Sequence, residues 1–168
     1  MSKTFGTAAP LGTSGEFEGK AARIVVTRLS ALDASFYSRE DSSTPMHVGS
    51  LAIIRKPRGG FTYEELLALV ESRLPQVPRY RQKVKEIGFG LARPVWLDDV
   101  DFDVTYHIRR SALPSPGSDG QLQDLVARLT SRPLDRSRPL WEMYLVEGLS
   151  KNRLAIYTKT HQALSLIH

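Results

Sequence analysis

Apolar and polar residues recur along the chain with two periods, and the longer period predicts two amphipathic helices. The first helical pattern follows Thr62, with Glu65 three residues later, and the second follows Ser118 or Asp119. Thr followed three positions later by Glu is the capping-box pattern that starts a helix. Apolar positions three and four apart form one stripe that faces a core. The two stripes are Leu66, Leu67, Val70 and Leu74, and Leu122, Leu125, Val126 and Leu129.

Short apolar runs between turn residues predict strands around these helices. Gly, Pro and Asn interrupt the runs and mark the turns. The segment 148–152 contains Gly and Asn and favours a hairpin between the last two strands. The predicted strands are 48–55, 80–87, 95–97, 102–108, 140–146 and 154–160. Because strands and helices do not alternate regularly, we expect an α/β fold of the α+β kind, a mixed-sheet sandwich, rather than a doubly wound sheet.

Composition divides the chain into three segments. Residues 1–21 are rich in Gly, Ser, Thr and Ala with little apolar periodicity, so we predict a disordered leader. Residues 22–164 contain the predicted elements and form one folded unit. Residues 165–168 follow the last predicted strand and end the chain. The total of 168 residues fits one ordinary domain or part of a larger one.

Residue content and charge exclude several classes of protein. The chain has no cysteine, which excludes a disulfide scaffold, a thiolate zinc site and a cysteine nucleophile. Its apolar runs are far shorter than the ~20 residues that span a bilayer. The formal net charge of +5 favours an anionic partner, which would be nucleic acid, anionic lipid or a phosphate-bearing molecule.

The densest basic cluster lies at alternate positions of one predicted strand. It consists of Arg79, Arg81, Lys83 and Lys85, which a strand would place on one face. A solvated strand face is the preferred interpretation, and an anion-binding strip is the alternative. No aromatic residue interleaves with these cations on that face, so nucleic-acid binding is poorly supported.

Two further groups are interpreted as structural from the residues alone. His47 follows Met46 and precedes a strand, with no metal ligand or nucleophile beside it, so we interpret it as a structural histidine. The acidic stretch 98–103 lacks the central Gly and final Glu of an EF-hand loop, so a solvated turn is favoured over a calcium site. We therefore predict no metal site.

Two groups near the end of the chain combine charge with strand ends. The segment 133–142 is bounded by Pro and is predicted to form a structural corner with a local ion-pair set. That set consists of Asp135, Arg136, Arg138 and Glu142. His161 closes the last predicted strand, a placement suited to chemistry, although one His beside Gln162 defines no mechanism.

Taken together and in order, these groups resemble the bacterial wax ester synthase/acyl-CoA:diacylglycerol acyltransferase family. The resembling segments are Leu29–Asp33, Pro45–Gly49, Pro94–Asp103 with His107, Leu113–Gly117, Pro133–Glu142, Glu147–Leu149 and Lys159-x-His161. The resemblance covers about residues 28–164. It implies the N-terminal half of a chloramphenicol-acetyltransferase-like, coenzyme-A-dependent acyltransferase fold, in which two similar halves enclose a channel. The tripeptide Pro139-Leu140-Trp141 corresponds to a hallmark of this family that is treated as structural.

The resemblance also implies an activity and its site. In this family a His-His-x-x-x-Asp-Gly motif lies in the channel, and its second His removes a proton from a diacylglycerol or fatty-alcohol hydroxyl, which attacks the acyl-CoA thioester. Here His161 occupies the first position and Gln162 the general-base position, while Leu166 and Ile167 replace the Asp and Gly. The implied partners are acyl-CoA as cosubstrate and the lipid acceptor, with no cofactor, no metal and no nucleic acid.

These departures change what we expect of this chain by itself. A neutral glutamine amide does not accept a proton near pH 7, and loss of a general base costs roughly 10²–10⁴-fold in rate. We therefore expect a truncated or frameshifted acyltransferase half that is inactive alone, unless His161 or another group acts as base. The alternatives are a non-catalytic lipid-surface module and a subunit completed by a separate C-terminal half. The expected location is the cytoplasm, with peripheral contact to membrane or lipid droplets.

Overall fold

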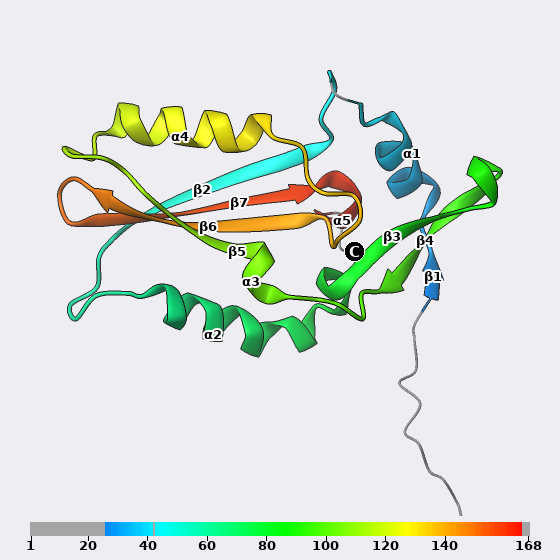
Figure 1. Cartoon of the computed structure of the whole chain (residues 1–168), viewed down its shortest axis with the longest axis horizontal. Helices are drawn as coiled ribbons and strands as arrows, with labels where there is room; N and C mark the ends of the chain where they lie inside the picture. Colours follow the sequence, from blue (N-terminus) through cyan, green and yellow to red (C-terminus); the bar gives the residue numbers. More distant parts are fainter. Residues whose placement is uncertain (1–25, 42, 166–168) are drawn as a thin grey trace, which may run out of the picture.

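The computed structural model describes residues 26–41 and 43–165, which form two sheets with helices around them (Figure 1). The larger sheet has the strand order β2-β7-β6-β5, and the smaller has the order β1-β4-β3. All pairs are antiparallel except β5 with β6, which are parallel, so the larger sheet is mixed. The strands are β1 Val26–Arg28, β2 His47–Arg55, β3 Gln82–Ile87, β4 Ala92–Asp98, β5 Ile108–Ala112, β6 Trp141–Leu149 and β7 Arg153–His161.

Two long helices cover opposite faces of the larger sheet. On one face, Leu66 of α2 (Tyr63–Arg73) shares a core with Leu145 and Leu154. On the other face, α4 (Asp119–Ser131) packs on the residues that alternate with these, including Val146 and Ala155. Successive strand residues point to opposite faces, so β6 and β7 supply both cores. The expected mixed-sheet α/β sandwich is therefore confirmed.

Both long helices begin where the sequence predicts. The Thr62 hydroxyl accepts from the backbone N–H of Glu65, whose carboxylate accepts from the Thr62 N–H. Ser118 and Gln121 form the same reciprocal cap on α4, which selects Ser118 over Asp119 as the cap. These caps satisfy N–H groups that would otherwise lack a partner at each helix start.

The predicted strand 102–108 is wrong over most of its length. Asp103 accepts from the backbone N–H of Thr105 and caps a single helical turn, α3 (Val104–His107). The strand β5 begins only at Ile108 and runs parallel to β6. An aspartate that bonds the backbone two residues on offers the chain an alternative to extended pairing, and it prevails here.

The predicted basic strand face is also wrong, because residues 78–81 form a 3₁₀ turn before β3 begins. Arg79 stacks over the ring of Trp96 at 4.9 Å, and Arg81 lies 5.4 Å from the ring of Phe102. Lys83 donates to Asp99 at 2.8 Å. Three of the four cations therefore have individual partners and do not form one solvated strip. Pro78 at the start of the turn favours helical over extended backbone.

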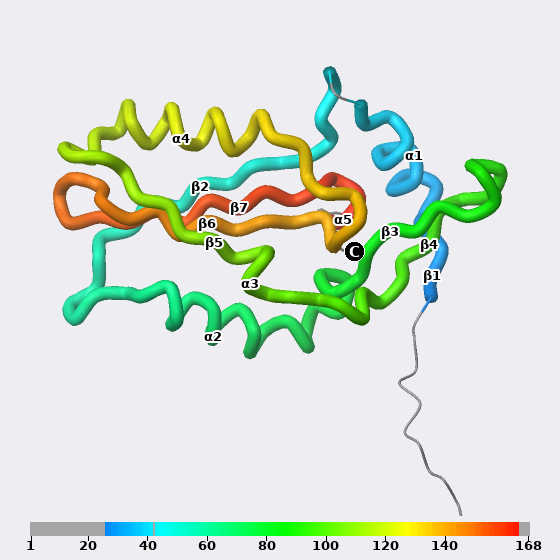
Figure 2. The backbone as a smooth tube through the Cα atoms, viewed as in Figure 1, coloured from blue at the N-terminus to red at the C-terminus, as the bar shows by residue number. Residues whose placement is uncertain are grey.

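The smaller sheet and two short helices lie at one end of the larger sheet, where β7 ends (Figure 2). The helix α1 (Ala31–Arg39) follows β1 and begins at Ser30, whose hydroxyl accepts from the N–H of Asp33. The helix α5 (Gln162–Ser165) follows β7 directly. The predicted leader, residues 1–21, and residues 166–168 lie outside the described residues.

Candidate functional site

The candidate site lies at the C-terminal end of β7. His161 is the last residue of this strand and is fully buried, with 0% of its surface exposed. The next residue, Gln162, begins α5, so a helical turn follows the strand directly. The register places His47 of β2 opposite His161. The structure therefore brings together two histidines that are far apart in the sequence.

Hydrogen bonding assigns the proton of the His161 imidazole. The backbone N–H of Ala163 donates to Nδ1 of His161 at 3.0 Å. Because Nδ1 accepts, the neutral ring carries its proton on Nε2. That nitrogen lies 3.4 Å from Oε2 of Glu40, a buried carboxylate at the end of α1, and has no hydrogen bond of good geometry within the described residues. Sequence reasoning missed Glu40, because no motif surrounds it.

The surroundings of His161 favour its neutral form. Burial lowers the pKa of His161, and the Glu40 carboxylate opposes this shift. The Arg136 guanidinium lowers the pKa of His161 further. A neutral ring with Nδ1 already accepting and Nε2 protonated has no lone pair left for a substrate proton.

Gln162 is half-buried, and its backbone is fixed by β2. Its N–H donates to the carbonyl of Met46 at 2.7 Å, which extends the β2–β7 pairing by one residue. Ala163 and Leu164, at variable positions of the family motif, are buried in the core shared with α1. The start of α5 is therefore anchored on both sides of position 162.

The tripeptide Pro139-Leu140-Trp141 contacts the candidate site through its backbone. The carbonyl of Leu140 accepts from the N–H of His161 at 3.0 Å. The Trp141 indole donates to the carbonyl of Tyr80 at 2.8 Å, and the Trp141 carbonyl accepts from Nδ1 of His107 at 2.7 Å. The tripeptide therefore joins the 3₁₀ turn before β3, α3 and the end of β7.

Two side chains from the sheet hold the C-terminal end of α4. Lys159 is buried and donates to the carbonyls of Leu129 and Arg132 at 2.9 and 2.7 Å. Nε2 of His47 lies 2.6 Å from the carbonyl of Thr130, so this nitrogen must donate. Cationic and N–H donors at this position satisfy the last carbonyls of a helix and its dipole. These contacts support the structural interpretation of His47.

Within the segment 133–142, the predicted ion-pair set is correct for the pair of Arg138 with Asp135, which lie 3.7 Å apart. Arg136 instead reaches Glu86 at 3.9 Å. Glu142 faces Lys159 of β7 at 3.5 Å, because alternation along β6 points it under α4 and away from the corner.

The acidic stretch 98–103 is less solvated than predicted. Asp99 is buried and accepts from Lys83, and Asp98 accepts from the side chain of Gln82 at 2.7 Å. Asp103 caps α3. Within residues 26–41 and 43–165, no three His, Asp or Glu side chains converge in a way that would hold a metal ion.

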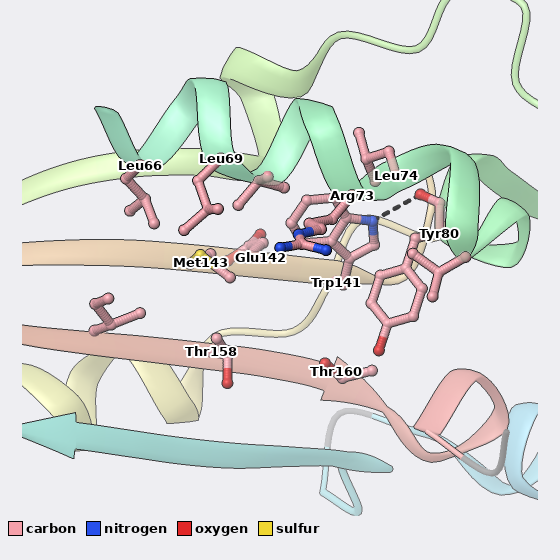
Figure 3. Close-up of a pocket in the computed structure, with 13 residues that line it drawn as sticks. Leu66, Leu69, Arg73, Leu74, Tyr80, Trp141, Glu142, Met143, Thr158 and Thr160 are labelled. Atoms are coloured by element: carbon pink, nitrogen blue, oxygen red, sulfur yellow. Dashed lines mark hydrogen bonds between the residues drawn. The ribbon is translucent and has the colours of Figure 1, made fainter. Parts of the chain in front are cut away.

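An apolar groove of about 460 Å³ lies between α2 and the faces of β6 and β7 (Figure 3). Leu66, Leu69 and Leu74 form its wall on the helix side, and Met143 and Ile156 belong to the sheet side. Thr158 and Thr160 line it toward the end of β7, so the groove extends to the strand residue next to His161. Its lining suits an apolar chain better than a polar ligand.

The fold places the chain in a class that includes solved acyltransferase and condensation domains. The solved wax ester synthase/diacylglycerol acyltransferase from Marinobacter aquaeolei VT8 superposes with a TM-score of 0.68 and 34% identity. This match covers 82% of the present chain and 35% of the other. The starter condensation domain of rhizomide synthetase RzmA shares the fold at TM-score 0.65 and 10% identity, over 83% of this chain and 34% of that one.

Within this class, residues 29–165 match the wax ester synthase/diacylglycerol acyltransferase catalytic domain, and the chain belongs to that family. A Mycobacterium tuberculosis (strain H37Rv) protein named "Probable diacyglycerol O-acyltransferase tgs3" is 72% identical over 140 residues. The match covers 83% of this chain and 52% of the relative, so the chain spans about half of that relative's length. The family resemblance predicted from the motifs is confirmed.

Proposed function

We propose that this chain supplies the β7–α5 part of a site for O-acyl transfer from a long-chain acyl-CoA to diacylglycerol or a fatty alcohol. The observation that carries the proposal is the buried His161 at the end of β7, followed by position 162 at the first residue of α5, inside the family match. The transfer needs no metal or other cofactor, because the thioester supplies the activated acyl group and a base removes the hydroxyl proton.

The chemistry at position 162 determines what the chain does alone. The reaction breaks the thioester C–S bond, forms an ester C–O bond, and moves the hydroxyl proton by way of a base to the departing coenzyme A thiolate. Gln162 has no basic lone pair, and His161 has its Nδ1 occupied by Ala163 and a proton on Nε2. The chain by itself therefore transfers acyl groups no faster than background.

The groove beneath α2 gives the acyl chain a place beside this site. It is apolar and lined by Met143 and Ile156 on the sheet side, and it extends to Thr160 next to His161. An acyl chain lying there would place its thioester end near the start of α5. Burial of each methylene would contribute about 0.8 kcal/mol to binding.

The test is release of coenzyme A, measured with a thiol reagent, from palmitoyl-CoA in the presence of diacylglycerol. We expect the chain to match a heat-denatured control, and turnover above that control would contradict the inactivity. A chimera would test the site, with residues 29–165 replacing the matching part of the 72%-identical mycobacterial relative. In the chimera, Gln162→His should raise the rate about 10²–10⁴-fold over the Gln162 form; equal rates would remove position 162 from the mechanism.

A second function, binding to a lipid surface without catalysis, is favoured by the apolar residues of β2. Val48, Leu51, Ile53 and Ile54 are each at least 39% exposed on this edge strand of the larger sheet. None of the helices in the described part of the chain has the length and hydropathy to cross a membrane. The contact proposed through these exposed residues is peripheral, from the cytoplasm, to membrane or lipid droplets. Flotation with anionic liposomes at low and high salt tests this, and absence of binding would exclude it.

The same strand edge could also pair with a separately encoded C-terminal half that completes the acyltransferase fold, since an edge strand offers unpaired backbone groups to another chain. Co-expression with the C-terminal part of the mycobacterial relative, followed by affinity capture of the pair, tests this version. Capture together with gain of coenzyme A release is the expected result, and no capture would contradict it.

A further inference from the structure

We infer that Glu40 is a positioning residue, which holds the His161–Gln162 motif in place through both carboxylate oxygens, one accepting from the Met46 N–H and the other lying 3.4 Å from Nε2 of His161. No family motif in the sequence includes this residue. The placement of the general base at position 162 is taken from the proposed function, and the rest of the inference does not depend on that function.

Glu40 links three elements at the site. It is the C-terminal capping residue of α1. Oε1 of Glu40 accepts from the backbone N–H of Met46, just before β2, at 3.3 Å. Oε2 lies 3.4 Å from the protonated Nε2 of His161 at the end of β7.

These contacts close a ring through the backbone. The carbonyl of Met46 accepts from the N–H of Gln162 at 2.7 Å, and Gln162 is bonded covalently to His161. Glu40 therefore reaches position 162 by two routes, one through Met46 and one through His161. A residue held from two directions has less freedom to shift than one held by a single bond, and placement within about 0.5 Å is what catalytic groups require.

The second contact of Glu40 places a carboxylate beside a buried polar atom. Nε2 of His161 is fully enclosed and has no hydrogen bond of good geometry within the described residues, so the Glu40 carboxylate at 3.4 Å faces it through electrostatic attraction. The Glu40 side chain is itself buried, at 7% exposed, so water does not replace it readily. Glu40 and His161 therefore stabilise each other's placement at the end of β7.

The substitution Glu40→Gln distinguishes the contacts that the Glu40 carboxylate makes from a role in packing alone. It has the shape of glutamate but only one acceptor oxygen, and its amide nitrogen donates. In Glu40→Gln, one of the two donors, the Met46 N–H or the His161 Nε2–H, must face an NH₂ group. A residue needed only to fill space would tolerate this exchange, whereas a residue that acts through both carboxylate oxygens would not.

The experiment is amide hydrogen exchange, followed by NMR, on the full chain and on Glu40→Gln. We expect the Gln162 amide to lose protection about tenfold or more, as for loss of a hydrogen bond to a charged group. The amides of Leu145 and Ala155 in the centre of the sheet should stay within about twofold, as expected for local opening. Unchanged exchange at Gln162, or an equal loss at all three amides, would overturn the inference.

Two further measurements complete the test. Nitrogen-15 spectra of the imidazoles should show His161 with its proton on Nε2, and a proton on Nδ1 would overturn the arrangement. Glu147→Gln is the matched control, because Glu147 pairs with Arg110 at the surface and lies away from the site; it should leave Gln162 exchange unchanged. None of these readouts uses acyl transfer, so failure of the proposed function and failure of this inference give different results.

Discussion

Gly117 and Gly148 meet backbone to backbone where the loop before α4 contacts the β6–β7 hairpin. A Cβ on Gly117 would overlap the carbonyl of Gly148, and Gly117 has a φ of +71°. The carbonyl of Gly117 accepts from the N–H of Ser150 at 2.8 Å. A Cβ on Gly148, which has a φ of +80°, would lie 2.8 Å from the carbonyl oxygen of Leu113. Two motif segments that are separate in the sequence, 113–117 and 147–149, therefore form one junction, and these two close approaches explain the glycines at 117 and 148.

This junction predicts a large effect of a single methyl group. Gly117→Ala should lower the free energy of unfolding by about 2–4 kcal/mol, because the positive φ and the overlap both oppose a side chain. Urea denaturation followed by circular dichroism measures it. Gly120→Ala is the control: its Cβ would approach nothing closer than 3.9 Å, and in the first turn of α4 it should stabilise by up to about 1 kcal/mol. An equal change in the free energy of unfolding for Gly117→Ala and Gly120→Ala would contradict this explanation of Gly117.

Local signals predicted the elements more reliably than the pairing between them. The caps at Thr62 and Ser118 and the apolar stripes act within one turn of a helix, so they located both helices without any tertiary information. The strand predicted at 102–108 failed because the Asp103 cap competes with extended backbone. Pro78 and the 3₁₀ turn likewise removed Arg79 and Arg81 from the predicted strand.

Lys159 provides a test of buried charge. Its ammonium group lies between the carbonyls at the end of α4 and the Glu142 carboxylate. Lys159→Met should destabilise the fold by about 3–5 kcal/mol, since it leaves Glu142 buried with one cation fewer. Lys159→Met combined with Glu142→Gln should recover part of that loss, because the unpaired charge is then removed. The measurement is urea denaturation of each variant.

A control variant distinguishes this effect from loss of any lysine. Lys85→Met, at an exposed position of β3, should change stability by less than about 0.5 kcal/mol. If Lys159→Met behaves like Lys85→Met, the buried network contributes no net stability.

The residues of the candidate site were predicted only in part. The resemblance located His161 and Gln162, because they lie within one short motif. Glu40 and His47 were not assigned to the site, since only the β2–β7 register and the end of α1 bring them to His161. Lys159 was also missed, because alternation along β7 assigns a face to it without revealing which carbonyls lie there.

Two buried histidines predict loss of stability in mild acid. Burial lowers the pKa of His107 and of His161 below the ordinary value of 6.5. The unfolded chain then takes up protons before the folded protein does, so the free energy of unfolding falls as the pH drops below about 6.5. Urea denaturation at pH 7.5, 6.0 and 5.0 should show a steady decrease, and equal or greater stability at pH 5.0 would contradict it.

His107 offers a variant for the same measurement. Its ring stacks between Phe102 and Trp141, with centroids at 5.1 and 4.6 Å. His107→Phe keeps an aromatic ring there but cannot titrate. Its stability should decline less between pH 7.5 and 5.0 than that of the unchanged protein, whatever its value at pH 7.5. An identical decline would assign the acid sensitivity to other groups.

The groove beneath α2 predicts a dependence of binding on acyl-chain length. Ile156→Trp would fill the sheet side of the groove. It should weaken binding of palmitoyl-CoA at least about tenfold, because each methylene left in water forgoes about 0.8 kcal/mol, and it should leave acetyl-CoA binding unchanged. Leu51→Trp, at an exposed position of β2, is the control and should affect neither ligand. Calorimetric titration measures the affinities of the unchanged protein and both variants for the two ligands, and equal loss for both acyl lengths in Ile156→Trp would show that the tryptophan acts on the fold and not on an acyl-chain site.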